Sequence, residues 1–397
     1  MTPATTLQVP DEYVAPPPRV RLPLDVLATL AVVGLGICSL VTLRSATATD
    51  VAGQPNYYVE RQGIYLAIGL ALMLGLSRID YSRLREFKYG LYAALILGIL
   101  AVLGAGHAAL GAQRAINLPF FSFQASELGK VLLILSLSAY VVDRSRRLGE
   151  RDTTARVMLL ALFPAMLVIA QPDLGSGMVY VAIALMTLFV AGTSWKQITG
   201  LIVLGVVAIT LVLVAAPAAG VHVLHPYQVQ RLTAFLHPSD NPSSKGYQQN
   251  ESKIAIGSGE VSGRGALNSS QQQLGYLPES NTDFVFAALG ERYGFLGAAL
   301  VLALYALLIW RALRILVMSK NLFGTLVAGG ILAMLMFQVF VNVGMTVGIM
   351  PITGVPLPLM SYGGSSVIAT FLAVGLLQSI YVQARAAAAY KGRVLRF

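Results

Sequence analysis

The chain has 397 residues, of which 56% are hydrophobic and only 12% are charged, and its mean hydropathy is +0.70. A soluble domain carries about 25% charged residues, so lipid rather than water surrounds most of this chain. The net charge of +10 argues for basic cytoplasmic loops and not for a nucleic-acid partner. The single cysteine, Cys38, excludes a disulfide within the chain and argues against a thiolate metal site.

Residues 1–22 are polar and proline-rich, and no signal-peptide cleavage site follows the first apolar run. We therefore predict a disordered cytoplasmic tail over these residues. A membrane-spanning helix needs about 20 mostly apolar residues. Ten apolar segments follow: 26–44, 60–77, 89–106, 128–142, 157–171, 175–194, 197–217, 284–311, 322–346 and 365–384. They predict an all-α integral membrane protein with ten transmembrane helices within residues 23–385 and a cytoplasmic C-terminal tail over 386–397.

The basic residues set the predicted orientation. Of the 28 lysines and arginines, 19 fall in the two tails and in the connections after the second, fourth, sixth and eighth segments. With ten spans, all of these regions lie on one side, and the positive-inside rule makes that side cytoplasmic. We therefore expect both termini in the cytoplasm and the remaining connections outside.

One predicted outer connection is long. Residues 218–283, between the seventh and eighth segments, are polar and glycine-rich, and they contain Lys253. Apolar residues at helical spacing beside Arg231 predict a short helix on the membrane surface. Loops of this length in compact proteins are functional or disordered, and the apolar content of this one favours function.

Ionisable residues near the outer ends of the segments are candidate site residues, because charges in a membrane are costly. Glu127 and Lys130 lie at the start of the fourth segment, directly after Ser126, which we predict to be the N-cap of this helix. The two charges share a helix face, so they could form a local ion pair. Since Lys130 lies inside the apolar run, we favour a cation that binds phosphate near a helix N-terminus.

Two other outer charges have open alternatives. Arg114, before the fourth segment, could extend to the interface or bind a phosphate. Asp173 follows Pro172, which breaks the apolar run between the fifth and sixth segments. An N-cap of the sixth helix, with Gly175 permitting close packing, is the simplest role for Asp173.

Asp283 opens the eighth segment and is a candidate general base, although an N-cap role would also fit. Glu291 and Arg292 lie further along the same run, so we expect this helix to face a wet cavity. Three prolines within residues 351–366 then exclude a continuous helix between the last two segments. Irregular backbone at membrane depth must be buried in protein or line a cavity.

These outer segments combine cations for phosphate with carboxylates for acid–base chemistry, which suits a lipid-phosphate substrate. No ATP-binding signature is present, and the GxG pair of Gly257 and Gly259 lacks the strand–helix context of a nucleotide site.

Five motifs in the same order resemble the SEDS family (shape, elongation, division and sporulation), which includes RodA and FtsW. They read GAQRAINLPFFSFQASELGK (111–130), QPDLGSG (171–177), SKIAIGSGEVSGRGAL (252–267), LGYLPESNTDFVFAALGERYGFLG (274–297) and GIMPITGVPLPLMSYGGSS (348–366). The last of these is more similar to the RodA branch than to FtsW. Glu251 departs from the family, which often has Gln at that position.

The resemblance implies a ten-span fold and a peptidoglycan glycosyltransferase in the bacterial cytoplasmic (inner) membrane, acting on the outer face. It places the family's catalytic aspartate on Asp283. It places other functional positions on Glu127, Lys130 and Asp173. It also implies a class B penicillin-binding protein, a transpeptidase, as the partner.

The resulting hypothesis is that the protein polymerises lipid II into β-1,4-linked glycan strands, with undecaprenyl pyrophosphate as the leaving group. Asp283 would deprotonate the acceptor hydroxyl, and one base suffices for a reaction that inverts the donor C1. Lys130, Arg114 and Lys253 would stabilise the pyrophosphate. No motif requires a cofactor, although a divalent cation such as Mg²⁺ or Mn²⁺ could assist. A lipid II flippase and a non-catalytic scaffold for the transpeptidase are the alternatives.

Overall fold

The computed structural model describes residues 24–47, 54, 56–105, 107–109, 112–118, 121–147, 149–211, 245–265, 269, 277 and 279–394. The predicted tail over 1–22 and the predicted surface helix beside Arg231 lie outside the described residues.

Each of the ten apolar segments overlaps one helix. These are α1 (Val26–Ala46), α2 (Tyr57–Leu76), α3 (Lys88–Ala105), α4 (Ala125–Asp143), α5 (Arg151–Ala170), α6 (Leu174–Val190), α7 (Trp195–Thr210), α12 (Val285–Met318), α13 (Leu322–Val347) and α14 (Gly364–Val394). Within the described ranges, eight helices are long and apolar enough to cross a membrane, and α6 and α7 are shorter apolar helices. The chain is therefore a mostly helical integral membrane protein.

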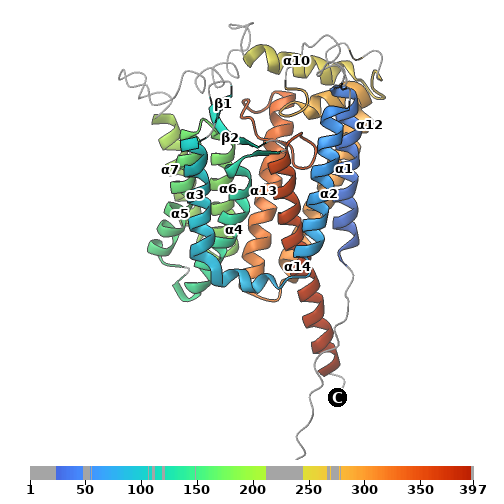
Figure 1. Ribbon diagram of the computed structural model, residues 1–397. Coiled ribbons are helices and arrows are strands. Elements are labelled where there is room, and N and C mark those ends of the chain that lie inside the picture. The colour runs from blue at the N-terminus through green and yellow to red at the C-terminus, as the bar shows by residue number, and fades with distance from the viewer. Residues whose placement is uncertain are drawn as a thin grey trace, which may run out of the picture.

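The helices run side by side in a bundle whose two ends differ (Figure 1). One end, here called the sheet end, carries a small β-sheet and the helix α10 (Lys245–Ser258). The opposite end, here called the η1 end, carries the short 3-10 helices η1 (Tyr81–Phe87) and η2 (Ser145–Arg147). The last helix, α14, continues beyond the bundle at the η1 end (Figure 1).

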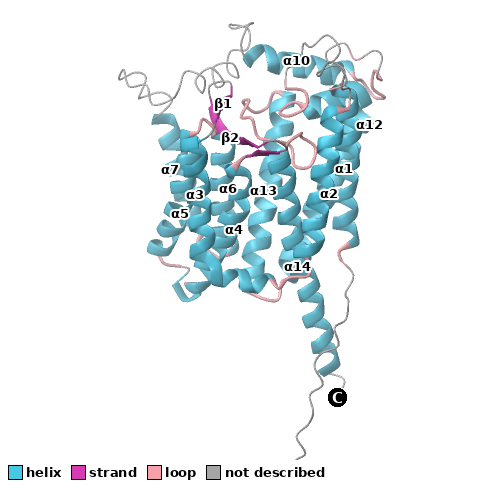
Figure 2. Ribbon diagram, in the orientation of Figure 1, coloured by secondary structure: helices cyan, strands magenta, loops and turns pink. Residues whose placement is uncertain are grey.

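The sheet was not expected from an all-α fold. Its strands β1 (His107–Ala109), β2 (Ala112–Leu118) and β3 (Phe121–Phe123) form antiparallel pairs in the order β1-β2-β3 (Figure 2). Ile116 pairs with Phe123 and Leu118 with Phe121. A connection at the end of a membrane bundle must satisfy its backbone polar groups within the protein, and strand pairing does so here. The pattern of apolar runs contains no signal for this pairing.

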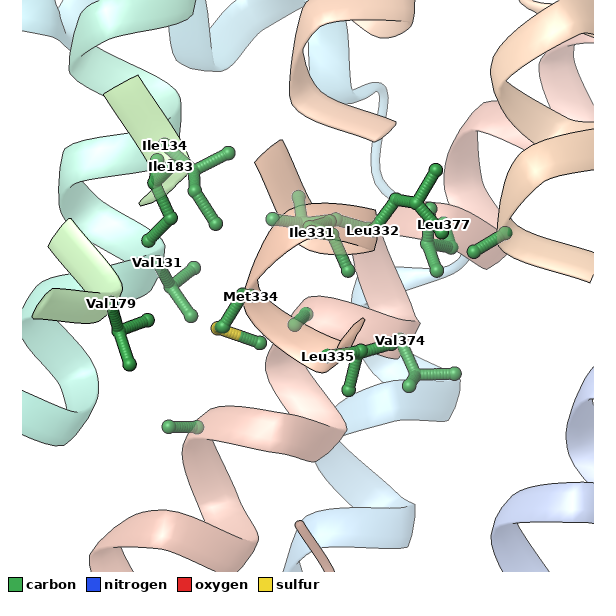
Figure 3. Packing of buried hydrophobic residues seen from close by; sticks show 14 of the residues in the cluster. Val131, Ile134, Val179, Ile183, Ile331, Leu332, Met334, Leu335, Val374 and Leu377 are labelled. Atoms are coloured by element: carbon green, nitrogen blue, oxygen red, sulfur yellow. The ribbon is translucent and has the colours of Figure 1, made fainter. Parts of the chain in front are cut away.

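The core is built around α13, which lies between α4 and α6 on one side and α14 on the other (Figure 3). The contacting side chains are aliphatic and fully or almost fully buried: Val131, Ile134, Val179, Ile183, Ile331, Leu332, Met334, Leu335, Val374 and Leu377. Lipid tails are as apolar as these side chains, so close packing rather than exclusion of water stabilises their association.

The eighth apolar helix, α12, is broken near its start. Gly294 has φ 64° and ψ −159°, a conformation that L side chains rarely adopt. The turn after α10 docks against this break: the amides of Arg264 and Gly265 donate to the carbonyls of Glu291 and Arg292, at 3.0 and 3.1 Å. A Cβ on Gly294 would overlap the backbone of this turn. The glycine-rich segment therefore allows two backbone segments to pack closely together.

The packing of this turn against α12 corrects one expectation. We expected Glu291 and Arg292 to make α12 face a wet cavity, but the Glu291 side chain is completely buried. Glu291 does not line the cavity described below. The docked turn packs around the helix break inside the protein and supplies hydrogen-bond partners for its backbone carbonyls in place of water.

Candidate active site

Asp283 lies in the wall of a cavity of about 460 Å³. The wall is built from the ends of α2, β3 and α14, the turn that precedes α12, and the segment between α13 and α14. Its residues are Arg61, Tyr65, Ser122, Gln124, Thr282, Asp283, Gly354, Pro356, Tyr362, Gly363, Gly364, Ser365 and Ser366. A volume of this size is typical of sites that enclose a small molecule or part of a larger one.

The backbone around Asp283 is held from two sides. Asn342 of α13 donates from Nδ2 to the Asp283 carbonyl at 3.0 Å and to the Val355 carbonyl at 2.8 Å. Ser361 donates from its Oγ to the Thr282 carbonyl at 2.6 Å. Asp283 does not cap α12, whose N-cap position is Phe284. The carboxylate is therefore presented by a braced turn and is not consumed in a helix cap, as a positioned general base requires.

The proline-rich segment 351–363 is irregular, as its prolines predict, and three further helices besides α13 anchor it. Tyr305 of α12 donates to the Pro358 carbonyl at 2.5 Å, and Ser39 of α1 donates to the Met360 carbonyl at 2.9 Å. Gln62 of α2 donates to the Ser361 carbonyl at 3.3 Å. The backbone carbonyls of this segment have no partners within a helix or sheet of their own, and these side chains supply them. The segment therefore forms a fixed cavity wall.

Arg61 is the basic residue among those that line the cavity. Its guanidinium lies 4.5 Å from the centre of the Tyr57 ring, and it belongs to none of the ion pairs found among the described residues. Tyr362 packs edge-on against Tyr58, with 4.8 Å between ring centres. Burial and the neighbouring Tyr65 raise the pKa of the Tyr362 hydroxyl well above its usual value, so it stays protonated. The described part of the wall thus offers a cation and aromatic surface beside Asp283.

Asp173 lies behind this wall and is buried. One carboxylate oxygen accepts the Ser176 amide at 3.1 Å and caps α6, as the sequence indicated. The other accepts from Ser126 Oγ at 3.0 Å and from Gln124 Nε2 at 3.2 Å. Since Gln124 lines the cavity, Asp173 holds one side chain of the cavity wall in place through this hydrogen bond. A Cβ on Gly175 would press on Val355 and the Thr353 carbonyl, so the predicted close packing is present.

Glu127 and Lys130 form a buried ion pair, with 2.6 Å between Lys130 Nζ and Glu127 Oε1 and exposures of 2% and 1%. Neither side chain lines the cavity. The prediction of Ser126 as the N-cap is wrong: α4 begins at Ala125 after Gln124. Ser126 instead donates across to Asp173, so its hydroxyl links two helices. We call Glu127, Lys130 and Asp173 the buried cluster.

The other two predicted phosphate contacts lie apart. Lys253 is an exposed residue of α10 that does not line the cavity. Its side chain packs against Gly348 at the end of α13, while Gln249 and Ser252 of α10 donate to the Met345 and Thr346 carbonyls in the last turn of that helix. Arg114 belongs to β2, and its side chain lies outside what the structure describes. Phosphate contacts by Arg114 and Lys253 stay predictions.

Within the described ranges, no group of three or more His, Cys, Asp or Glu side chains could hold a metal ion. Among the described residues that line the cavity, Asp283 is the single carboxylate. One carboxylate together with substrate phosphates is a ligand set that Mg²⁺ accepts. A metal at this position would therefore depend on the substrate for most of its ligands.

Comparison with known proteins gives the family. Residues 23–386 match the cell cycle protein family of FtsW, RodA and SpoVE. The chain belongs to the SEDS family. It is 37% identical over 361 residues to the peptidoglycan glycosyltransferase MrdB of Escherichia coli K12, covering 91% of this chain and 94% of that protein. It is 34% identical over 359 residues to a probable peptidoglycan glycosyltransferase FtsW of Geobacter metallireducens, covering 89% and 92%.

Solved structures agree with this placement in the SEDS family. A chain from a peptidoglycan synthase complex that coordinates polymerization and crosslinking superimposes with a TM-score of 0.75 at 30% identity, covering 91% of this chain and 99% of that one. The rod shape determining protein RodA of Thermus thermophilus superimposes with a TM-score of 0.67 at 28% identity, covering 91% and 98%.

Segment 351–366 was predicted to be buried or to line a cavity, but among the residues of this SEDS cavity only Asp283 was predicted as a site residue. Arg61 carried a usable signal, since it is a charge near the start of an apolar helix and so meets the criterion that selected the other candidates. Gln124 and Tyr362 carried none, because a neutral residue at a helix end or in a loop is not unusual. Only the packing of α2, α4 and segment 351–363 brings them to the cavity of Asp283.

Proposed function

We propose that this chain is a peptidoglycan glycosyltransferase that polymerises lipid II on the outer face of the bacterial cytoplasmic membrane, in support of cell elongation and shape. The observation that carries this proposal is that Asp283 and Arg61 line the same cavity, together with hydroxyl and aromatic side chains. A carboxylate beside a cation suits a reaction that removes a proton from a sugar hydroxyl and releases a pyrophosphate.

In the proposed reaction, the acceptor is the 4-hydroxyl of N-acetylglucosamine in lipid II. Its oxygen forms a bond to C1 of the N-acetylmuramic acid at the end of the donor strand, and Asp283 takes the hydroxyl proton. The bond between C1 and the phosphate oxygen breaks, and undecaprenyl pyrophosphate leaves with the electron pair. A single displacement inverts C1 and converts the α-linked donor into a β-1,4 link, which needs only one base.

Arg61 is the residue that we assign to the pyrophosphate, because its charge lines the cavity and is not used in an ion pair among the described residues. A preorganised cation stabilises the charge that grows on the leaving group. The buried cluster would act indirectly: Asp173 orients Gln124, and the Glu127–Lys130 pair fixes the first turn of α4. If a divalent cation takes part, Asp283 and the substrate phosphates would hold it and it would supply further stabilisation of the leaving-group charge, which chelation during turnover tests.

We further propose that all ten apolar helices cross the membrane, with both termini and the η1 end in the cytoplasm and the sheet end outside. Exposed aromatic residues near the η1 end, among them Tyr89, Trp195 and Trp310, lie beside basic residues, as expected at the cytoplasmic interface. A class B penicillin-binding protein is the proposed partner, since a similar chain belongs to a complex that couples polymerization to crosslinking.

The test is polymerisation of labelled lipid II by the purified protein together with its transpeptidase partner. We expect a ladder of glycan products from the wild type and none from Asp283→Asn, with partner binding unchanged. If neither protein gives a ladder while the wild type moves lipid II across liposome membranes, the protein is a flippase. Normal polymerisation by Asp283→Asn would remove Asp283 from the mechanism.

A further inference from the structure

A second cavity, of about 340 Å³, lies at the η1 end of the bundle. It is lined by Ser82, Arg85 and Glu86 of η1, by Lys88 at the start of α3 and by Asp143 at the end of α4. Asp143 ends the helix whose first turn lies behind the Asp283 cavity, so the two cavities are about 27 Å apart along α4. The proposed glycosyl transfer makes no use of this second cavity.

Two cations in this cavity share one carboxylate. Arg85 donates to Asp143 Oδ1 from Nη2 at 2.7 Å and from Nε at 3.3 Å, and Lys88 forms an ion pair with Asp143 Oδ2. The Arg85 side chain remains 45% exposed. The guanidinium of Arg85 and the ammonium of Lys88 thus converge on the two oxygens of the Asp143 carboxylate. The same arrangement of donors suits the oxygens of a bound anion such as phosphate.

The surroundings carry an excess of positive charge. Residues 81–88 and 143–147 together contain six basic and two acidic side chains. Arg83, Arg146 and Arg147 are exposed and take part in no ion pair among the described residues, and Arg144 lies 4.0 Å from the centre of the Tyr140 ring. Glu86, the other acid in the lining, offsets one of these charges. An additional anion is therefore favoured here.

The surface next to the cavity is apolar. Phe87 and Tyr89 flank Lys88 and are 61% and 77% exposed. Further along α3, Leu97 and Leu100 are also exposed. Aromatic residues mark the membrane interface, and exposed leucines on a spanning helix contact acyl chains. A phosphate in the cavity would thus sit at headgroup depth with its hydrocarbon chains along α3, an arrangement that a soluble phosphate cannot use.

We infer that this cavity is a binding site for the phosphate of an anionic phospholipid, in which Asp143 holds the two cations in place until the phosphate engages them. Basic pockets between membrane helices bind such headgroups in other proteins. On binding, Arg85 and Lys88 exchange part of their contact with Asp143 for the phosphate oxygens. The inference does not depend on the glycosyltransferase proposal or on which leaflet surrounds the η1 end.

The test is native mass spectrometry of the delipidated full-length protein in detergent, titrated with phosphatidylglycerol or phosphatidylcholine of the same chain length. We expect the wild type to bind phosphatidylglycerol about tenfold more tightly, as for a charge-assisted contact. The double variant Arg85→Gln/Lys88→Gln loses this preference. Asp143→Asn increases it, because the internal competitor is neutralised. Arg156→Gln, which breaks the exposed pair with Asp152 on α5, is the matched control and leaves it unchanged.

The opposite responses of the two variants separate ligand binding from structure. If Asp143→Asn weakens binding as much as Arg85→Gln/Lys88→Gln does, the ion pair is only structural and the inference is wrong. Equal binding of the two lipids by the wild type also overturns it. Inorganic phosphate is added as a competitor: displacement of phosphatidylglycerol at equal concentrations would assign the cavity to a soluble phosphate instead. Retained polymerisation of lipid II confirms that each variant is folded.

Discussion

Two polar groups of residues lie one behind the other at the sheet end, and they differ in what their charges contact. The cavity wall presents Asp283 and Arg61 to a space of about 460 Å³. The buried cluster keeps Glu127, Lys130 and Asp173 at most 4% exposed, bonded to each other or to neighbouring residues. Both groups stand out in the sequence as charges near membrane helices. Exposure to the cavity is what separates residues that can meet a substrate from residues that shape its site.

The largest expected effect is that of Asp283→Asn. The substitution keeps the size of the side chain and removes the base, so we expect polymerisation of lipid II to fall by about 10²–10⁴-fold. The midpoint of thermal unfolding in detergent should not change, because the contacts of this turn with Asn342 and Ser361 are made by backbone carbonyls. A rate within threefold of the wild type would place the proton acceptor elsewhere.

The next prediction concerns the Glu127–Lys130 pair. Lys130→Met leaves the Glu127 carboxylate buried without its cation, and breaking a buried pair in this way costs about 3–5 kcal/mol of stability. Replacing both partners, as in Glu127→Gln/Lys130→Met, removes the unpaired charge and should restore most of the unfolding midpoint. If the pair only supports the wall, the double variant also recovers polymerisation to within about tenfold of the wild type.

The double variant therefore decides how Lys130 works. A protein with a restored unfolding midpoint but no polymerisation would show that the Lys130 charge is itself required by the substrate. That result would return Lys130 to the phosphate-binding role suggested by its position in the sequence, and it would require the pair to open during turnover.

The sequence predicted the framework of this molecule better than its site. Apolar length located ten helices, eight of them long and apolar enough to cross a membrane within the described ranges, because a run of about 20 apolar residues has few alternatives in a bilayer. The prolines around Pro356 predicted the irregular segment, and Asp173 was predicted as a helix cap, because both effects act within a few residues. The three-stranded sheet was missed, since its pairing depends on the position of the chain at the end of the bundle.

The charged residues differ in how well their partners could be predicted. Glu127 and Lys130 form the local ion pair that their spacing allows, and the phosphate contact of Lys130 stays a prediction. Glu291 was expected beside water, but the turn after α10 packs against the break at Gly294 and encloses it. Arg61 was overlooked although it met the same criterion. A partner one helical turn away can be predicted from the sequence, whereas a partner that packing brings close cannot.

A smaller effect is expected at Arg61, which tests the phosphate role from the cavity side. Arg61→Ala should lower polymerisation by about 10²–10³-fold, the usual loss when one preorganised donor to a developing charge is removed. Arg61→Lys should recover part of the rate, since it keeps the charge but not the planar fork. Arg264, an exposed arginine of the same end that donates to the Ser258 carbonyl, is the control. Equal losses of polymerisation in Arg61→Ala and Arg264→Ala would show that Arg61 contributes only general positive charge and makes no specific contact with the phosphate.

The smallest effect is expected from Asp173→Asn, the same change of chemistry as Asp283→Asn but in the buried cluster. Asparagine caps helices as well as aspartate does, so its carbonyl oxygen can still accept the Ser176 amide. The Ser126 hydroxyl and the Gln124 amide can each turn to face the new NH₂ group, which preserves the hydrogen bonds across the helices. We expect a loss of stability of at most about 1 kcal/mol and polymerisation within tenfold of the wild type. Asp173→Ala removes the cap as well and should lose about 0.5–2 kcal/mol. If Asp173→Asn is instead as inactive as Asp283→Asn while its unfolding midpoint is unchanged, the negative charge of Asp173 acts on the reaction across Gln124, and the division between cavity wall and buried cluster fails at this residue.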